Sequence, residues 1–312
     1  MHRNHRSRTF TAIAVASGAL ALAGVTPLAG SPPAIAAGRP RVEHPRSAGD
    51  VPAAVRTPVP TATAQREGVT RAGGGYMGWE AHGSSTASPQ AVSPKALTGP
   101  DAVAQPDTSV TGIDVSRYQG NVNWASYWKQ GMRFAYVKAT EGTYNRSAYF
   151  TQQYNGSYKQ GFIRGAYHFA NPEDSGGAAQ ATYFVEHGGG WSGDGKTLPG
   201  VLDIEYNPYG GTCYGKTKAA MVSWIASFLN RYKALTGRDA VIYTTTDWWK
   251  TCTGNTSKFH TTNPLWVARY ASKAGTLPGN WPYYTFWQHT STPLDQDYFN
   301  GTVTRLRALA KG

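Results

Sequence analysis

The pattern of hydrophobic and polar positions divides the chain into three stretches. Residues 1–37 begin with basic side chains and continue as one long apolar run, whereas residues 38–109 are mostly Pro, Ala, Ser, Thr and Gly. From Val110 to the C-terminus, short apolar runs rich in β-branched and aromatic residues recur at regular intervals. This pattern predicts a leader, a low-complexity segment and one domain with a core of its own.

The apolar runs of the last stretch predict strands at 110–115, 134–139, 163–169, 200–204, 240–245, 265–268 and 284–287. Most of these runs are hydrophobic without interruption, which is typical of parallel strands buried on both faces. Among the helical patterns between them, Thr217 to Leu235 has the clearest apolar stripe, and Gly237 follows as a stop signal. Strands and helices that alternate over about 200 residues predict an α/β fold, a modified and irregular TIM-like β/α barrel short of eight regular units.

The first 37 residues have the features of a signal peptide, with small residues from Ala34 to Ala37 as a cleavage site. The apolar run is long enough to raise a membrane anchor as an alternative, but Pro27 and the many Ala and Gly residues favour cleavage and secretion to the extracellular space. Residues 38–109 have too few apolar side chains to offset the entropy of ordering, so we predict a disordered linker or pro-segment there. Within it, Tyr76 to Trp79 is a candidate docking patch on the domain at 110–312.

The charged residues indicate which class of binding partner the protein has. Lys and Arg number 30 against 18 Asp and Glu, which gives a net charge of +12. A basic exported protein is attracted to polyanions such as the anionic polymers of a bacterial cell wall. The basic residues form no run, which argues against nucleic acid as a partner, and we expect a monomer.

The two cysteines, Cys213 and Cys252, predict one disulfide.

The most informative motif is Leu202 to Glu205, which places Asp203 and Glu205 two residues apart in an apolar run. On a strand these side chains point the same way, roughly 6 to 7 Å apart. Because like charges and burial can raise the pKa of one carboxyl while the other stays ionised, the pair suits acid-catalysed cleavage of a glycosidic bond. The structural alternative is a solvated strand end.

Barrels of this kind carry their chemistry at the C-terminal ends of the strands. Reading these ends in order gives a set of polar and aromatic side chains: Asp114, Lys138 with Glu141, His168, Asp203 with Glu205, Tyr243, Arg269 with Tyr270, and Trp287 with Gln288. Their convergence predicts a substrate pocket. The chain has no His-Glu-x-x-His and no histidine pair with zinc-ligand spacing, so we expect neither a metal nor a cofactor, and His168 is assigned to substrate hydrogen bonding or to structure.

The segment from Gly210 to Thr217 is the strongest rival signal, because it matches the phosphate-loop pattern G-x-x-x-x-G-K-T. Tyr206 to Tyr209 separate it from the segment that carries Asp203 and Glu205, and a disulfide at Cys213 and export of the chain both disfavour a nucleotide site. The same segment imitates a nucleophile elbow with Cys213 as nucleophile, but no strand leads directly into it.

With these residues in view, the domain resembles glycoside hydrolase family 25, the N-acetylmuramidases of the Chalaropsis lysozyme type. The matching segments, in order, are GIDVSRYQG from Gly112, FAYVKATEG from Phe134, GAYHFA from Gly165, LDIE from Leu202, LWVARY from Leu265, FWQH from Phe286 and DQDYFNG from Asp295. The resemblance implies a modified β/α barrel that hydrolyses the β-1,4 bond between N-acetylmuramic acid and N-acetylglucosamine in peptidoglycan.

The resemblance also implies roles for single residues. Glu205 is expected to be the general acid, Asp203 the residue that positions substrate or intermediate, Asp114 a third acid and Asp295 a fourth, with Asp297 as the alternative to Asp295. The remaining substrate-binding candidates are Tyr167, His168, Tyr243, Arg269, Tyr270, Trp287 and Gln288. Retaining, inverting and substrate-assisted routes stay open, and the last, with the substrate's own acetamide as nucleophile, is favoured. A chitinase-like hydrolase and a non-catalytic wall-binding module are the alternative functions.

Overall fold

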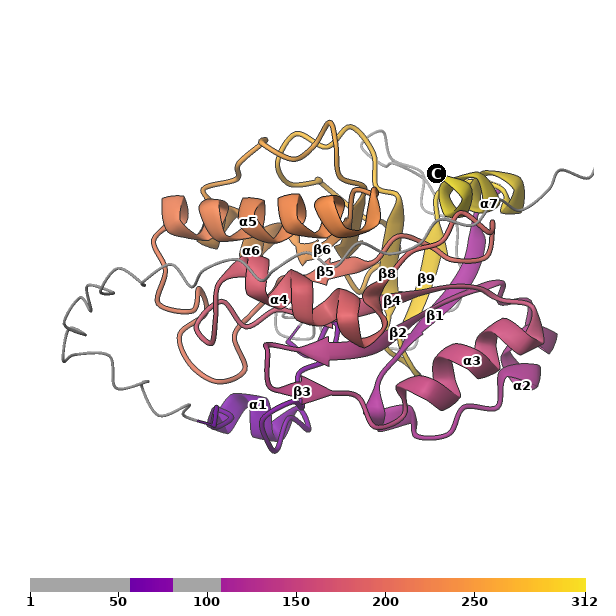
Figure 1. The fold of residues 1–312 in the computed structure, drawn as a ribbon, viewed down its shortest axis with the longest axis horizontal. Coiled ribbons are helices and arrows are strands. Elements are labelled where there is room, and N and C mark those ends of the chain that lie inside the picture. The colour runs from indigo at the N-terminus through magenta and orange to yellow at the C-terminus, as the bar shows by residue number, and fades with distance from the viewer. Residues whose placement is uncertain (1–56, 81–107) are drawn as a thin grey trace, which may run out of the picture. The chain divides into compact units, whose positions relative to one another are not determined.

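The computed structural model describes residues 57–80 and 108–312, and strands close into a barrel at its centre (Figure 1). Neighbouring strands follow the order β1-β9-β8-β7-β6-β5-β4-β2, and β2 pairs back onto β1 to complete the ring. Their bounds are β1 Val110–Val115, β2 Phe134–Glu141, β4 Ile163–Phe169, β5 Val201–Asp203, β6 Val241–Thr245, β7 Leu265–Ala268, β8 Phe286–Thr290 and β9 Gln296–Phe299. The short strand β3, Asn145–Arg146, extends the sheet outward from β2. The predicted modified β/α barrel is confirmed.

Strand β9 is the element that the hydrophobic pattern missed. It pairs antiparallel with both β1 and β8, whereas β1, β2 and β4 to β8 pair in parallel. Its buried positions alternate, with Asp297 and Phe299 inside and Gln296 and Tyr298 half-buried. Because alternating burial leaves no continuous apolar run, this strand did not stand out beside the parallel ones. The seven predicted strands are present with small shifts at their ends.

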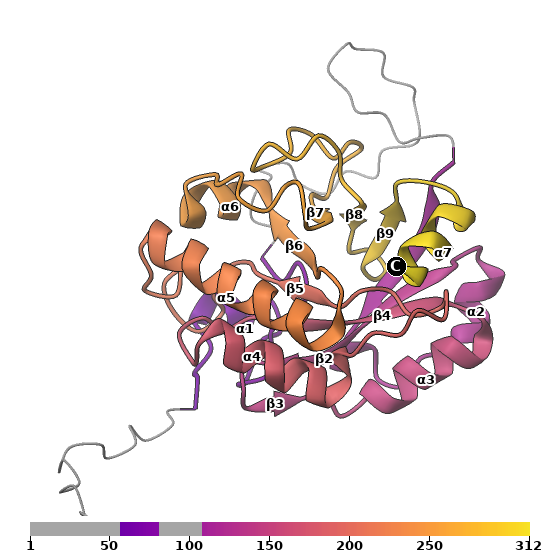
Figure 2. The ribbon, with the colours of Figure 1, turned by 45° about the horizontal axis from the view of Figure 1, so that its top comes forward.

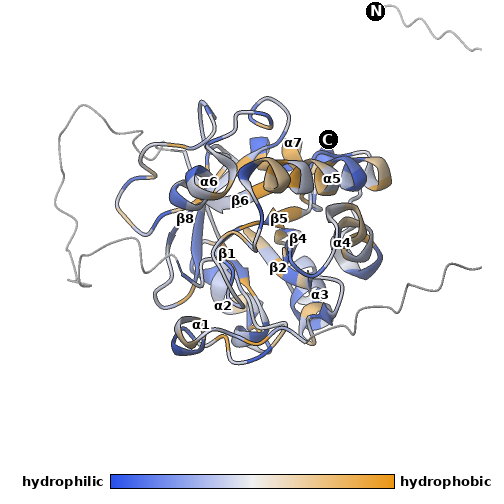
Figure 3. Ribbon diagram, turned by 90° about the vertical axis from the view of Figure 1, so that its left-hand side faces the viewer, coloured by the Kyte–Doolittle hydropathy of each residue, from blue (hydrophilic) through white to orange (hydrophobic). Residues whose placement is uncertain are grey.

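Helices surround the strands on the outside (Figure 2). The longest, α5 (Lys218–Thr236), matches the predicted helix: the Thr217 side chain caps its start, and Gly237 ends it with a left-handed φ of 74°. The hydrophobic colouring concentrates where helices meet strands, and the outward helix turns are hydrophilic (Figure 3). The other helices are α2 Trp124–Lys129, α3 Phe150–Gln160, α4 Gly177–Phe184, η3 Val185–Gly189, α6 Thr246–Thr253 and α7 Val303–Lys311, and the 3-10 turn η2 spans Arg117–Gln119.

Aromatic rings fill the barrel interior below the strands' C-terminal ends. The Trp266 ring centroid lies 4.9 Å from that of Tyr136 and 5.4 Å from that of Phe286. Gly165 on β4 provides the space, because a Cβ there would lie 2.2 Å from the Tyr136 ring. The barrel is therefore a packed core with an aromatic floor, and a polar site has room only at its mouth.

Residues 57–80 are ordered against the barrel, which corrects the prediction of disorder for this part of 38–109. They include a short helix, α1 (Ala62–Arg66), and bury Val69 and Trp79 in one cluster with Phe169 of β4. The physical reason is that the few apolar residues of the segment, too sparse for a core of their own, find one on the barrel. The predicted signal peptide at 1–37 lies outside the described residues and stays a prediction. No helix in the described ranges is both long and apolar enough to span a membrane.

The predicted disulfide between Cys213 and Cys252 is present, with Cα atoms 5.3 Å apart and a sequence separation of 39. It ties the loop after β5 to helix α6. We expect the Cys213→Ser/Cys252→Ser double variant to lose about 3 to 4 kcal/mol in the free energy of unfolding, because a loop of this length is no longer closed in the unfolded chain. Urea denaturation monitored by fluorescence measures the change. A loss below about 1 kcal/mol would show that the loop adds no entropic restraint.

Candidate active site

The carboxylates of Asp203 and Glu205 both lie inside the barrel mouth. Their neighbours Leu202 and Ile204 belong to the outer core that packs against the helices, so the strand alternation turns the two acids inward. Asp203 is 1% exposed and Glu205 0% exposed. The structure thus brings the predicted pair onto one face, at the C-terminal end of β5.

Burial raises the pKa of Glu205 well above its usual value, and the charge of Asp203 raises it further. Burial also raises the pKa of Asp203, with Asp114 and Glu141 adding to the effect and Lys138 opposing it. Apart from the neighbouring Glu205 carboxyl, no hydrogen-bond donor among the described residues reaches the oxygens of Asp203, and Oε2 of Glu205 has no partner outside this pair. A buried acid without donors favours its neutral form, so the pair is set up to hold and release a proton.

Asp114 at the end of β1 is held by a chain of side-chain hydrogen bonds. Gln288 Nε2 donates to Asp114 Oδ2 at 2.7 Å, and the Tyr243 hydroxyl donates to Gln288 Oε1 at 2.6 Å. The Tyr270 hydroxyl lies 3.1 Å from the same Gln288 oxygen and 3.4 Å from Asp295 Oδ1. Residues from β1, β6, β8 and the loops after β7 and β8 therefore meet at one side of the mouth.

Asp295 and Asp297 share a face of the closing segment, two residues apart. Asp295 is 8% exposed and contributes to the raised pKa of Glu205, whereas Asp297 is fully buried and faces Gly112 of β1 in register. Burial is the main cause that raises the pKa of both acids, and the charge of Asp114 raises each pKa further. The structure thus puts Asp295 nearer the mouth and Asp297 deeper in the barrel.

The other predicted substrate-binding residues divide by strand alternation. Tyr167 is fully buried in the cluster of apolar residues inside the barrel, together with Tyr136 and Trp266. Burial raises the pKa of its hydroxyl, and the charges of Asp114 and Asp203 raise it further. His168, one residue on, faces the helices: its ring stacks on Phe228, and its nitrogens contact Thr140 Oγ1 and Gln180 Oε1. The structure therefore favours the structural alternative for His168, and burial lowers its pKa to about 4.

Trp287 and Arg269 also lie outside the site. Trp287 packs in the outer core, and its indole donates to the Arg269 carbonyl, because Gln288 takes the inward position of β8. Arg269 is exposed, and its guanidinium donates to the Lys273 carbonyl. The structure therefore does not bring these two side chains to the mouth, because strand alternation turns each of them outward.

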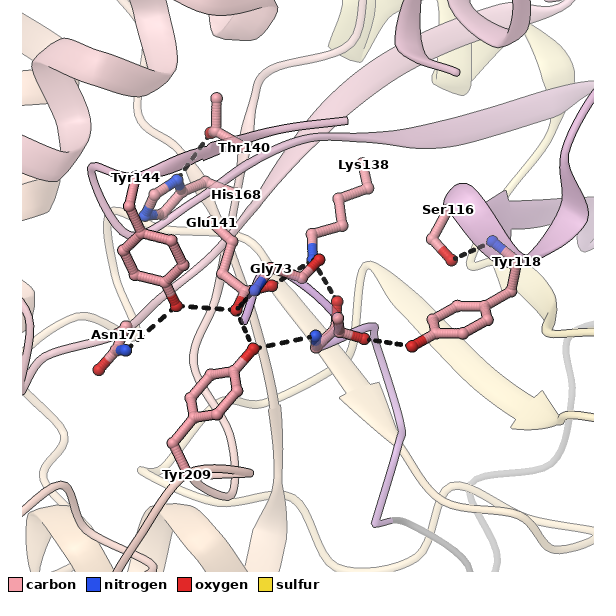
Figure 4. A network of polar contacts seen from close by, with 12 residues as sticks. Gly73, Ser116, Tyr118, Lys138, Thr140, Glu141, Tyr144, His168, Asn171 and Tyr209 are labelled. Carbon is pink, nitrogen blue, oxygen red and sulfur yellow. Dashed lines mark hydrogen bonds and ion pairs between the residues drawn. The ribbon is translucent and has the colours of Figure 1, made fainter. Parts of the chain in front are cut away.

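A second polar cluster, which the sequence analysis noted at a strand end but did not assign to the site, surrounds Lys138 and Glu141 (Figure 4). The two form a buried ion pair, 1% and 0% exposed. Glu141 Oε1 accepts from the hydroxyls of Tyr144 and Tyr209 and from the backbone N–H of Gly73 at 3.1 Å. The position of Lys138 and Glu141 at the end of β2 was the available signal.

The phosphate-loop motif does not have the context that phosphate binding needs. Strand β5 ends at Asp203, the motif begins at Gly210, and the segment between forms turns. Cys213 is in the disulfide, and the Thr217 hydroxyl caps α5. In residues 57–80 and 108–312, no three His, Cys, Asp or Glu side chains are grouped so as to hold a metal ion.

The comparisons with known proteins agree with this geometry. The family model described as Glycosyl hydrolases family 25 matches residues 113–298. Lysozyme M1 of Streptomyces globisporus is 51% identical over 223 residues, which make up 68% of this chain and 76% of that protein. The N,O-diacetylmuramidase of Chalaropsis sp is 49% identical over 65% of this chain and 100% of its own length. A solved muramidase from Acremonium alcalophilum is 56% identical with a TM-score of 0.64, covering 65% of this chain and 99% of that one.

The titration of Asp114 predicts a pH dependence of stability. Burial raises the pKa of Asp114 from 3.8 to about 7, so the folded state binds this proton more tightly than the unfolded chain does. The resulting stabilisation is complete below about pH 4 and is lost as the pH rises through about 7. Asp114→Asn removes this titration while keeping an oxygen for Gln288. Its free energy of unfolding relative to wild type should rise by roughly 2 to 4 kcal/mol between pH 4 and pH 8.

Urea denaturation at both pH values measures this difference. Asp239→Asn is the matched control, because Asp239 lies at the surface in an ion pair with Lys233. A relative stability of Asp114→Asn that is the same at both pH values would contradict the assignment.

Proposed function

This chain belongs to glycosyl hydrolases family 25, and from that premise we propose that it is a secreted lysozyme, a 1,4-β-N-acetylmuramidase with Glu205 as its general acid. The family match and the muramidase and lysozyme relatives make it a glycosidase of muramidase type, with peptidoglycan as substrate. The bond cleaved would be the one between N-acetylmuramic acid and N-acetylglucosamine, in catabolism of the bacterial cell wall or in bacteriolysis. Secretion rests on the predicted signal peptide.

The observation that carries the residue assignment is the buried pair at the end of β5. Burial and the charge of Asp203 raise the pKa of Glu205, which favours the protonated acid that can donate to the glycosidic oxygen as the bond breaks. Asp203 lies beside it, and in the described part of the chain no donor other than Glu205 reaches its oxygens. A carboxylate kept buried without a partner is costly to stability, and sites of catalysis are where such a cost is retained.

Asp203 is assigned the task of orienting the substrate's 2-acetamido group. Its carboxyl oxygens can accept the acetamide N–H, which aims the acetamide oxygen at the anomeric carbon. In its ionised form, Asp203 also stabilises the positive charge that develops on the amide. Asp114 and Asp295 would line the opposite side, held by Gln288 and Tyr270. The rings of Tyr167 and Tyr243 offer surfaces and hydroxyls for the sugar.

The reaction products test both the bond and the route. After digestion of peptidoglycan, borohydride reduction of the new ends should yield muramitol, because the muramic acid residue carries the new reducing end. In the first minutes of reaction, NMR should show a β-anomer, since an internal nucleophile followed by water gives net retention. Glucosaminitol would contradict the muramidase assignment, and an α-anomer would contradict the acetamide route.

The Glu205→Gln variant tests the general acid. We expect turnover on peptidoglycan to fall by at least about a hundredfold, the scale for loss of a positioned proton donor, while wall binding is retained. The control is Glu186→Gln, because Glu186 is exposed on η3 outside the barrel. Turnover by Glu205→Gln that equals that of the control would refute the role of Glu205.

A further inference from the structure

The backbone of Gly78 occupies the mouth of the barrel. Its N–H donates to Glu205 Oε1 at 2.7 Å, and its carbonyl lies 3.4 Å from the Tyr270 hydroxyl. A Cβ at this position would lie 2.1 Å from the Tyr270 oxygen and 2.6 Å from Gln288 Oε1, and φ is +74°. Glycine is therefore the residue that fits here, in direct contact with the proposed general acid and with two residues of the Asp114 network.

The residues on either side of Gly78 are buried on the barrel. Met77 is 0% exposed in the interior cluster that includes Tyr167 and Tyr243. Trp79 is 1% exposed, packs in the cluster with Val69 and Phe169, and donates its indole N–H to the Tyr206 carbonyl at 2.9 Å. Two large side chains thus anchor the segment on the barrel, as the sequence suggested for the patch from Tyr76 to Trp79.

The glycines before this patch engage the Lys138–Glu141 pair (Figure 4). Glu141 accepts from the Gly73 N–H, and Lys138 Nζ donates to the carbonyls of Gly73 and Gly75. A Cβ on Gly75 would lie 2.7 Å from the Phe169 ring, so the backbone lies directly on the aromatic surface. The backbone of this segment thus supplies hydrogen-bond partners for both charges of the buried ion pair.

Further contacts hold the start of the segment. The Thr61 N–H donates to the Pro208 carbonyl at 2.8 Å, and the Tyr118 hydroxyl lies 2.9 Å from the carbonyls of both Gly68 and Gly74. Residues 57–80 therefore contact the loops after β1, β5 and β7 and the ends of β2 and β4. These elements surround the catalytic acids on several sides.

The segment lies outside the part of this chain that matches the family. The family match begins at residue 113, and the Chalaropsis and Acremonium proteins are covered to 100% and 99% by only 65% of this chain, about the length of residues 110–312. Those proteins have no room in their own length for a counterpart of residues 57–80. A glycan polymer must reach Glu205, yet Glu205 is 0% exposed here with the segment in place.

We propose that residues 57–80 are an intramolecular inhibitor that fills the glycan groove and must leave before peptidoglycan binds. This inference rests on the proposed function. The Gly78 N–H takes the acid oxygen that would face the glycosidic bond, Met77 and Trp79 take the place of sugar rings, and the Lys138–Glu141 pair holds the incoming peptide. Because residues 81–107 link the segment covalently to the barrel, its effective concentration is high, and inhibition needs no tight binding in trans.

A matched pair of valines on the segment tests the proposal without touching the barrel. Val69 is 0% exposed at the interface and Val59 is 72% exposed. In the full chain, Val69→Asp would bury an unpaired charge in the docked state and so open the groove, whereas Val59→Asp adds the same charge to solvent. We expect Val69→Asp to raise turnover on peptidoglycan at least about tenfold, because turnover follows the fraction of open molecules. Val59→Asp should match wild type.

A second variant, Gly78→Val, and a second measurement, chemical labelling of Glu205, test the inhibitor independently of Val69→Asp and of activity. Gly78→Val places a branched side chain against Tyr270 and Gln288 and should open the groove like Val69→Asp. Labelling of Glu205 by a water-soluble carbodiimide, followed by mass spectrometry, reports access to the groove independently of activity. We expect slow labelling in wild type and Val59→Asp, and labelling at least about tenfold faster in the two opened variants.

The outcomes separate this inference from the proposed function. Equal turnover and equal Glu205 labelling in wild type and Val69→Asp would overturn the inhibitor. Faster labelling in the opened variants without any hydrolysis of peptidoglycan would support the closed groove and contradict the muramidase. Adding Glu205→Gln to Val69→Asp should abolish the gained activity, which ties that gain to the site under the segment.

Discussion

The burial of several carboxylates in one barrel mouth is the constraint on which the rest of the structure depends. Asp114, Asp203, Glu205, Asp295 and Asp297 are all at most 8% exposed, and burial is the leading cause of the raised pKa of each. Water cannot solvate them, so neutral forms and hydrogen-bond donors must take its place. The Gln288 amide and the hydroxyls of Tyr243 and Tyr270 supply donors at one side, and the aromatic floor formed by residues such as Trp266 keeps water out from below.

This arrangement favours catalysis at the expense of stability. Within the described structure, no donor other than Glu205 reaches the Asp203 oxygens, which is costly for a buried acid. In the proposed reaction, the acetamide N–H of the substrate supplies the donor that Asp203 lacks. The site is therefore complementary to bound substrate. The segment at residues 57–80 meets part of the same need, because its Gly78 N–H reaches Glu205. An acid site built for a polar ligand is thus also a site that a glycine-rich peptide of the same chain can occupy.

The barrel and the acid pair followed from local patterns. Continuous apolar runs located the parallel strands, and the i, i+2 spacing placed Asp203 and Glu205 on one face. The same patterns misplaced His168 and Trp287, because each follows an inward-facing neighbour or precedes one, and the end of a strand by itself does not say which way a side chain points. Strand β9 was missed since its alternating burial, with the charged Asp297 inside, resembles an exposed segment when only hydrophobicity is considered.

By itself the sequence determined the α/β barrel, the disulfide between Cys213 and Cys252, and the family resemblance that led to Glu205 and Asp203. These depend on residue type and on spacing along the chain, which are local. Only the tertiary structure decided which distant groups meet: Gln288 on Asp114, the Gly73 backbone on the Lys138–Glu141 pair, and Gly78 on Glu205. Those contacts join residues up to 174 positions apart. They arise because the closed ring of strands brings distant strand ends to one mouth, where even a low-complexity segment finds enough apolar surface to become ordered.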